Sequence, residues 1–339
     1  MAKIDVVIPC YNYGRYLRDC VGSVLAQSVL DLRVLIIDDA SCDDSTAMAT
    51  QIAASDKRVS VLTHATNRGH INTYNEGIDW ADSDYFLLLS ADDILVENAL
   101  QRAVEVMEAN ADIVLTYGDC IAWQETDPPP RIENVEHYSW TRSNLLLEIC
   151  ETASNCVPTP TAIGRTCVQK SVGGYRHALP HSGDMEMWLR YAAHGQVARI
   201  NAVQAIYRKH DAAMSNAYFS ALLSDFQQCQ RAFDVFFADN SALISNADNL
   251  ATLARKSLAR KVFRQGNTLI RQGRFRDGYR LLLEARRSDP TIDHIPLLLE
   301  LLRLPRAHGR GRIASALRKS PGNVMKWARR SQPVQRYRQ

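Results

Sequence analysis

Pairs of acidic residues follow apolar segments of strand length at two places in this 339-residue chain. Asp38 and Asp39 come directly after one such segment, and Asp92 and Asp93 follow another after Ser90 and Ala91. Carboxylates bind hard divalent cations such as Mg²⁺ or Mn²⁺, and they also accept hydrogen bonds from a ribose or a nucleobase. Each pair can instead cap a following helix, because Asp is common at helix starts. Packing of a hydrophobic core does not by itself produce acidic pairs after two different strands, so these pairs indicate a ligand site.

Two further segments carry groups that can move protons or bind a metal. Asp184 stands at the start of a short apolar segment that has helical spacing, where a carboxylate can act as a general base or simply cap the helix. His210 ends a Tyr-Arg-Lys-His segment. A single histidine is usually structural unless a metal lies near it. Neither segment indicates a site by itself.

The elements that position these residues alternate between strand and helix patterns. This alternation predicts an α/β fold with a doubly wound, mostly parallel sheet. Ligands of such sheets bind beyond the carboxyl ends of the strands, so Pro9, Tyr11 and Asn12, which follow the first strand, are expected beside the acidic pairs. We expect strands at 4–9, 33–37, 59–63, 85–89 and 113–117, and helices at 16–27, 43–54, 71–81 and 98–109.

The second half of the chain has a different pattern. Residues 120–160 are expected to be irregular, followed by a short helix at 185–194 and a strand at 198–207. From about residue 219 the pattern is helical throughout. Six residues there have the spacing of a single tetratricopeptide-like helical hairpin, and two ordinary packed helices fit them equally well. The six are Gly266, Leu269, Gly273, Phe275, Ala285 and Pro290.

The composition is that of an ordinary globular protein, with 46% hydrophobic and 23% charged residues. It excludes a disordered chain, collagen and a disulfide scaffold. No apolar run reaches the roughly 18 residues of a membrane span, and the first residues lead straight into a strand pattern rather than a signal peptide. None of the eight cysteines has CxxC spacing, so we expect reduced thiols in the cytosol.

Charge is distributed unevenly along the chain. Residues 301–339 contain eleven Lys or Arg and no Asp or Glu, whereas residues 1–300 contain 29 basic and 37 acidic residues. This basic tail is either a disordered, solubilising end or an attachment to an anionic membrane surface, with Trp327 at the interface. No other feature supports nucleic-acid binding.

Six segments of the chain match, in the same order, the motifs of one known protein family. They are IDVVIPCYNYGRYLRDCVGSVLAQSV, LIIDDASCDDS, NRGHINTYNEGI, YFLLLSADDIL, VGGYRHALPHSGDMEMWLRYAAHG and YRKHDAAMS. Over about residues 3–215 the chain closely resembles the family 2 glycosyltransferases, which have the Rossmann-like GT-A fold. We therefore expect a GT-A domain at 1–218, a helical region at 219–300 and the basic tail at 301–339.

The resemblance implies a role for each motif residue. Binding of Mn²⁺ or Mg²⁺ is implied for Asp92, Asp93 and His210. Asp184 matches the general base of inverting members. Two positions depart from the family, because Ser90 replaces an acid and Gly183 replaces the glutamate that commonly precedes the base. Nucleotide contacts are implied for Pro9, Tyr11, Asn12, Asp38, Asp39, Arg68 and Asp92.

The resemblance implies transfer of a hexose or hexosamine, with inversion, from a nucleotide-diphosphate sugar to a hydroxyl of a polysaccharide or lipid-linked glycan. UDP-sugars are the donor class that the resemblance favours. The expected location is cytoplasmic, on the inner face of the cell membrane. A nucleotidyltransferase is a rival, but its Gly-rich phosphate loop is missing at residues 10–15. The departures at Ser90 and Gly183 also leave room for a degenerate binding or scaffold module in a glycan-assembly complex.

Overall fold

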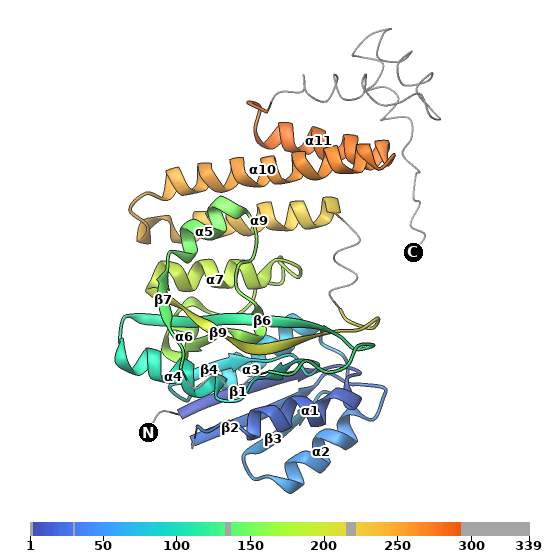
Figure 1. Ribbon diagram of the computed structural model, residues 1–339, viewed down its shortest axis with the longest axis vertical. Helices are drawn as coiled ribbons and strands as arrows, with labels where there is room; N and C mark the ends of the chain where they lie inside the picture. The colour runs from blue at the N-terminus through green and yellow to red at the C-terminus, as the bar shows by residue number, and fades with distance from the viewer. Residues whose placement is uncertain (1–2, 30, 133–136, 215–221, 293–339) are drawn as a thin grey trace. The chain divides into compact units, whose positions relative to one another are not determined.

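The computed structural model describes residues 3–29, 31–132, 137–214 and 222–292 (Figure 1). The chain divides into two compact units, residues 1–257 and the part from residue 258 onward. All the predicted site residues belong to the first unit. The basic tail predicted at 301–339 lies outside the described residues.

Four parallel strands form one half of the sheet in the first unit. They are β1 (Lys3–Cys10), β2 (Asp31–Asp38), β3 (Val59–Thr63) and β4 (Tyr85–Leu88), in the order β3-β2-β1-β4. The apolar residues of β1, β2 and β4 form almost continuous runs, as expected for parallel strands that are covered on both faces, whereas only Val59 is buried in the edge strand β3. The predicted parallel half of the sheet is confirmed.

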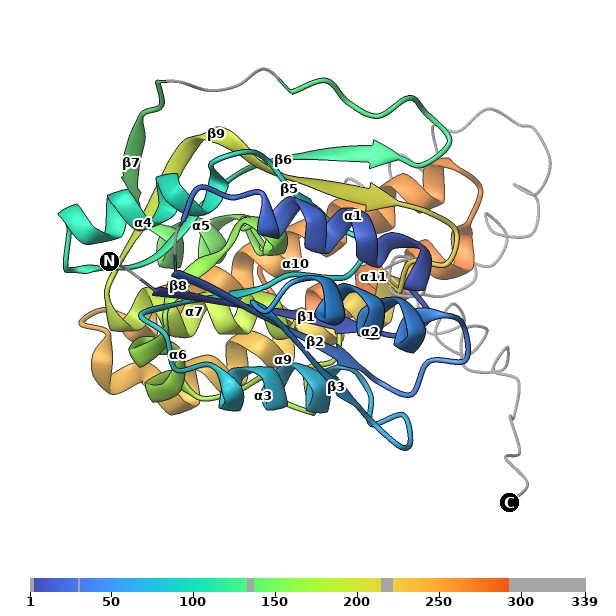
Figure 2. The same cartoon turned by 90° about the horizontal axis from the view of Figure 1, so that it is seen from below.

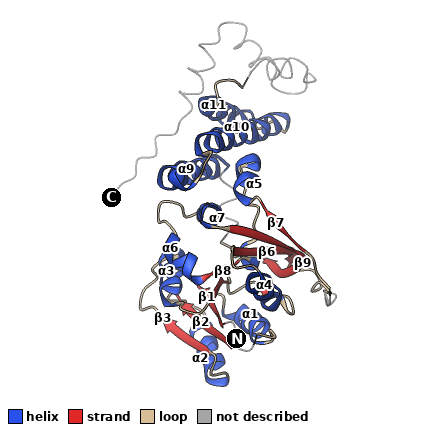
Figure 3. Ribbon diagram, turned by 90° about the vertical axis from the view of Figure 1, so that its left-hand side faces the viewer, coloured by secondary structure: helices blue, strands red, loops and turns tan. Residues whose placement is uncertain are grey.

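Helices cover both faces of these strands. Alternate residues of β1, among them Val6 and Ile8, join the core cluster that contains Leu17 of α1 (Gly14–Leu25). Val7 points to the other face, where Gly77 of α3 (His70–Trp80) packs against it. Figure 3 shows α1 and α3 on opposite sides of the sheet. Helices α2 (Ser45–Ser55) and α4 (Ala99–Ala109) complete the predicted alternation.

The other half of the sheet is mixed. Strand β8 (Ile163–Arg165) pairs antiparallel with both β4 and β6 (Ile113–Gln124), and β6 pairs parallel with β9 (Gln196–Lys209). The long β6 and β9 lie side by side in Figures 1 and 2. Strand β5 (Ile94–Leu95) and strand β7 (Trp140–Ser143) pair antiparallel with β9.

The prediction of an irregular segment at 120–160 was wrong. This segment contains the second half of β6, strand β7, helix α5 (Leu145–Thr152) and the 3₁₀ turn η1 (Thr159–Thr161). Gly118 and Asp119 interrupt the apolar pattern of β6 before its end, and the partner strand β9 is far away in the sequence.

Helices follow the sheet as predicted. The first unit also contains α6 (Thr166–Val172), α7 (Gly183–His194), α9 (Leu222–Asn240) and η2 (Ser241–Leu243). Helix α9 packs on α7. Because the first unit runs to Ser257, α9 lies in the same compact unit as the sheet. The boundary expected at 218–219 stays a prediction.

The described part of the second unit is a helical hairpin, formed by the end of α10 (Ala247–Arg271) and by α11 (Phe275–Ser288). Gly273 makes the turn with φ of +82°, a left-handed conformation that favours glycine. A Cβ at Gly266 would lie 2.9 Å from the carbonyl oxygen of Gly278, so the two helices approach closely there. The likeness to a tetratricopeptide hairpin stays a prediction.

All eight cysteines are free thiols. No helix in the described ranges has both the length and the apolar composition needed to cross a membrane.

Candidate functional site

The loops after β1 and β2 are locked together by Asn12. Its backbone N–H donates to the Ser41 hydroxyl at 2.8 Å, and its side-chain oxygen accepts from the Cys42 N–H at 2.7 Å. Asn12 takes a left-handed conformation with φ of 59°, which asparagine tolerates better than most residues. Tyr11 beside it is 46% exposed, and Pro9 is half-buried. Tyr11 is therefore free to contact a ligand.

Asp38 and Asp39 have different surroundings. The Asp38 carboxylate is fully buried and accepts hydrogen bonds from the hydroxyls of Ser41 and Thr46, the latter at 2.7 Å. Both of its oxygens are thus used to shape the loop that leads into α2. Asp38 positions this loop, whereas the next residue is turned toward a different set of partners.

The Asp39 carboxylate accepts hydrogen bonds from the backbone N–H groups of Arg68 at 2.7 Å and Gly69 at 2.9 Å. The Nδ1 atom of His64 lies 2.7 Å from the same carboxylate. Burial raises the pKa of Asp39, but these three interactions outweigh it and hold the pKa below its ordinary value. Asp39 is therefore a fixed anion at the end of β2.

His64 is a site residue that the sequence analysis missed. Its other ring nitrogen, Nε2, lies 2.7 Å from Glu76, and Glu76 also pairs with the Arg68 guanidinium at 3.3 Å. Each ring nitrogen thus lies within hydrogen-bond distance of a carboxylate, so His64 links Asp39 to Glu76. His64 directly follows β3, and applying the strand-end rule to that strand as well would have found it.

Asp92 and His210 come together although they lie far apart in the sequence. The Asp92 carboxylate is 3.1 Å from Nε2 of His210. Strand β9 runs antiparallel to β5, and this pairing brings its last residues back to the loop that follows β4. The rings of Tyr13 and Tyr16 pack on His210, with centroids 5.4 and 4.8 Å away. The histidine is thereby fixed beside the carboxylate.

Asp93 points to the backbone of β9 instead. Its Oδ1 accepts the Arg208 N–H at 3.2 Å, and burial together with the charge of Asp92 raises its pKa well above the ordinary value. The Arg208 guanidinium donates to the Asp92 carbonyl at 3.1 Å and lies 4.7 Å from the ring centres of both Tyr16 and Trp123. Arg208 and Asp93 thus hold the loop that presents Asp92.

Asp92 and His210 are the two predicted metal ligands that lie side by side. Within the described ranges no group of three or more His, Cys, Asp or Glu is placed to hold a metal ion. Mg²⁺ usually takes one or two protein carboxylates and completes its shell with water and substrate phosphates. A carboxylate and an imidazole 3.1 Å apart fit the protein's share of such a shell.

Asp184 lies in the first turn of α7 and accepts a hydrogen bond from the Thr159 hydroxyl at 2.9 Å. Burial raises its pKa above the ordinary value, although Thr159, Tyr175 and the charge of His70 act in the opposite direction. A carboxyl with a raised pKa is suited to accept a proton near neutral pH.

Two contacts connect Asp184 to the other site residues. His70 follows Gly69, whose N–H binds Asp39, and the His70 ring lies 3.3 Å from the carbonyl of Pro180 in the loop before α7. The turn η1, which carries the hydroxyl bound to Asp184, contacts the strands β4 and β5 on either side of the Asp92 loop. The structure thus brings the three predicted acidic segments to one edge of the sheet.

The comparisons with known proteins match this chain to glycosyltransferases. Residues 5–170 match the sequence profile described as Glycosyl transferase family 2. Glycosyltransferase GlyG of Streptococcus pneumoniae is 34% identical over 125 residues, 37% of this chain and 41% of GlyG. The matches span less than half the length of this and the next two curated relatives.

Solved structures share the fold at low sequence identity. TarS of Staphylococcus aureus, residues 1–349 in complex with UDP-GlcNAc, aligns with a TM-score of 0.64 at 15% identity, over 84% of this chain and 81% of that TarS fragment. The mannosyltransferase PcManGT of Pyrobaculum calidifontis, with GDP-Man and Mn²⁺, aligns with a TM-score of 0.54 at 13% identity, over 97% and 83% of the two chains. The expected GT-A fold is confirmed.

Proposed function

Residues 5–170 belong to glycosyl transferase family 2, and from that premise we propose that this chain transfers a sugar from a UDP-sugar to a hydroxyl of a polysaccharide or lipid-linked glycan, with inversion at the anomeric carbon. The observation that carries the proposal is the placement of Asp39 and of the Asp92–His210 pair. Asp39 follows β2 and Asp92 follows β4, and these two strands are separated by β1 alone. Two strand spacings are about 10 Å, a distance that a nucleoside can bridge.

The surroundings of Asp39 favour uracil as the base. A carboxylate offers about four acceptor positions. Arg68, Gly69 and His64 occupy three of them, which leaves one on Oδ2. Uracil presents a single N–H donor, at N3, whereas guanine presents two adjacent donors, at N1 and N2. The complex of TarS with UDP-GlcNAc supports the same choice.

In the proposed reaction the diphosphate lies at Asp92 and His210, which would hold Mn²⁺ or Mg²⁺. When bound, the cation offsets the charge that develops on the leaving diphosphate. Asp93 stays a candidate third ligand through its Oδ2, since Oδ1 is engaged by Arg208. Tyr11 is exposed and would lie against the nucleoside.

Asp184 would take the proton from the acceptor hydroxyl as that oxygen attacks the anomeric carbon. The UDP leaves from the opposite side of the sugar, so the configuration inverts and no covalent intermediate with the enzyme forms. The raised pKa of Asp184 supports this role, because a weak acid holds the abstracted proton.

Calorimetry with UDP and GDP, each with and without Mn²⁺, tests the donor assignment. We expect UDP to bind more tightly than GDP, and Mn²⁺ to strengthen the binding of both. Asp39→Asn should weaken UDP binding and reduce the preference, because an amide NH₂ at that position opposes the uracil N–H. A preference for GDP, or binding that Mn²⁺ leaves unchanged, contradicts the assignment.

A further inference from the structure

Gly183, directly before Asp184, leaves space that an aromatic ring fills. A Cβ at position 183 would lie 3.1 Å from Cδ1 of Tyr175, which is closer than ordinary van der Waals contact. An acidic side chain there would require the buried Tyr175 ring to move. Support for the Asp184 carboxylate must therefore come from other residues.

Thr159 supplies one such contact. Its hydroxyl donates to Oδ2 of Asp184 at 2.9 Å from a residue 25 positions away in the sequence. This hydrogen bond fixes the plane of the carboxylate. A hydroxyl does this without adding a second negative charge next to the base.

The turn that carries Thr159 is itself anchored. The Thr161 hydroxyl donates to the Pro158 carbonyl at 2.7 Å and accepts the Gly118 N–H of β6 at 3.2 Å. Thr161 is buried, and its hydroxyl is bonded to backbone groups. Thr161 therefore serves the turn, whereas Thr159 serves Asp184.

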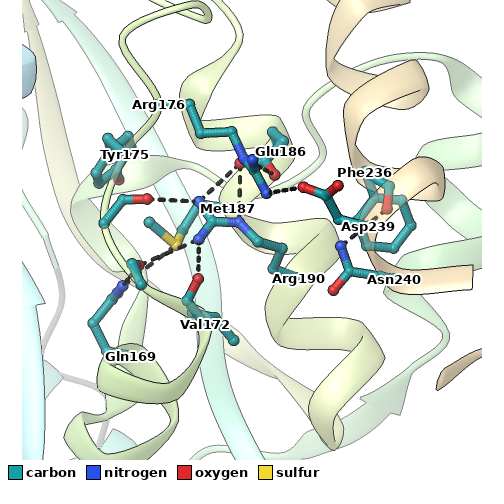
Figure 4. A network of polar contacts seen from close by, with 12 residues as sticks. Gln169, Val172, Tyr175, Arg176, Glu186, Met187, Arg190, Phe236, Asp239 and Asn240 are labelled. Carbon is teal, nitrogen blue, oxygen red and sulfur yellow. Dashed lines mark hydrogen bonds and ion pairs between the residues drawn. The ribbon is translucent and has the colours of Figure 1, made fainter. Parts of the chain in front are cut away.

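Tyr175 is held in place from two sides. Asn75 accepts the Tyr175 N–H at 2.6 Å and donates to its carbonyl at 3.0 Å. The preceding loop is bound by the Arg190 guanidinium, which donates to the carbonyls of Val172 and Gly174 (Figure 4). The aromatic ring lies over Gly183 as a result.

A buried ion network fixes this loop to α7. Glu186 is fully buried and pairs with Arg190 at 2.8 Å and with Arg176 at 2.9 Å. Arg176 also reaches Asp239 of α9 at 2.8 Å, as Figure 4 shows. Glu186 lies two residues after Asp184 on the same helix, so the network holds the base and Tyr175 in one rigid assembly.

We propose that Thr159 and Tyr175 are positioning residues for Asp184 and take the place of an acidic side chain at position 183. This proposal rests on the proposed function, in which Asp184 is the general base. Neither residue needs to contact the substrate. Their contribution is to hold the carboxylate in one orientation and to set its proton affinity.

The electrostatics of Asp184 agree with this assignment. Burial raises the pKa of Asp184, and the interactions with Thr159 and Tyr175 lower it. Removing either hydroxyl therefore raises the pKa of Asp184 further, so a larger share of the base is protonated at a given pH.

The test is a titration of Asp184 in Thr159→Val, with Tyr175→Phe as a second variant that removes only a hydroxyl. The pKa is followed by NMR on protein with ¹³C-labelled Asp carboxyls, and Asp184→Asn identifies the resonance. We expect the pKa of Asp184 to rise by about one unit. Turnover of the best donor found in a nucleotide-sugar screen should fall about ten- to a hundredfold.

Thr116→Val is the matched control, since it removes a buried hydroxyl of β6 that donates to the Ile163 carbonyl and does not hold the turn that carries Thr159. It should lower the melting temperature and leave the pKa of Asp184 unchanged. Thr159→Ser should restore both the pKa and the turnover, and all variants should bind UDP with Mn²⁺ as the wild type does.

A wild-type pKa and turnover in both Thr159→Val and Tyr175→Phe would overturn the proposal, and so would an equal pKa shift in Thr116→Val. Loss of UDP binding in Thr159→Val would also overturn it, by placing Thr159 in the donor pocket. Transfer that survives Asp184→Asn is a separate result, because it refutes the general base and hence the proposed function.

Discussion

At the scale of single residues, neighbouring carboxylates perform different tasks. Asp92 faces His210, whereas Asp93 is tied to the backbone of Arg208. The same division separates Asp38, which is enclosed by hydroxyls, from Asp39, which keeps a free acceptor position. In each pair one carboxylate holds the loop, and the other contacts a histidine that follows a different strand.

The Asp92–His210 pair leads to a prediction about metal dependence. Asp92→Asn should lower turnover by orders of magnitude and weaken Mn²⁺-dependent donor binding, because it removes charge at the proposed metal and diphosphate site. His210→Ala should weaken the same binding. Asp93→Asn should lower turnover too, because it replaces the Oδ2 that we propose as a third metal ligand and keeps an oxygen for the Arg208 N–H. Turnover and UDP binding are measured across a range of Mn²⁺ concentrations.

Asp19→Asn is the control for these variants, since Asp19 is an exposed partner of Arg208 and does not touch Asp92. It should stay close to wild type. Near-normal, metal-dependent transfer by both Asp92→Asn and Asp93→Asn would show that the metal site is elsewhere.

The raised pKa of Asp184 predicts the pH dependence of turnover. The base works when deprotonated, so kcat should increase with pH through a pKa that lies above the ordinary aspartate value of about 3.9. The lowered pKa of Asp39 keeps that carboxylate charged over the same range, so the Kd for UDP should stay constant. A Kd that changes together with kcat would count against assigning the titration to Asp184.

Single residues also show how far the sequence could predict the site. Each predicted acidic segment follows a strand or starts a helix, and such places can be recognised from local patterns. Thr159 and Tyr175 could not be predicted, because their contacts with Asp184 depend on how η1 and the loop before α7 fold against each other. The role of His64 could have been inferred from its place after β3.

At the scale of elements, prediction succeeded in the first half of the chain, where strand and helix patterns alternate. Strand β3 was predicted with its exact bounds, and the first four helices within about two residues of theirs. It failed at β7 and β8, which have four and three residues and acquire their identity by pairing with distant strands. Such short segments carry too few residues for a periodic pattern.

Asp5 joins several elements at the end of the sheet opposite the site, and it predicts a stability effect. Its fully buried carboxylate accepts from Arg33 of β2 at 2.7 Å, from the Ser83 hydroxyl at 2.7 Å and from two backbone N–H groups before β4. Asp5→Asn leaves Arg33 without its buried partner. The free energy of unfolding, measured with urea, should fall by about 3 kcal/mol.

Asp31→Asn is the control, because Asp31 forms an exposed ion pair with Lys3 that should contribute less than about 1 kcal/mol. Burial raises the pKa of Asp5, but its hydrogen bonds lower it more, so the folded pKa is below the unfolded one. The stabilisation is therefore present above the unfolded pKa of about 3.9 and is lost as the pH falls. Equal effects of the two substitutions would refute this role of Asp5.

At the scale of the whole molecule, the basic tail predicts attachment to membranes. Each Lys or Arg near an anionic surface contributes about 1 kcal/mol, and residues 301–339 carry eleven of them without acidic counter-charge. A protein truncated to residues 1–300 should keep its activity on soluble acceptor analogues and lose salt-sensitive binding to anionic vesicles. Flotation with phosphatidylserine vesicles measures this, and equal binding by the full chain would show that the tail is an inert end.

The most direct test of sugar transfer by this molecule is Asp184→Asn, assayed for donor binding and for transfer in the same preparation. Losing the general base should lower transfer about 10²- to 10⁴-fold. The Kd for UDP with Mn²⁺ should stay at the wild-type value, because the proposed role of Asp184 is to act on the acceptor hydroxyl and not to bind the nucleotide. A variant that loses UDP binding, or one that transfers sugar at the wild-type rate, would contradict the account.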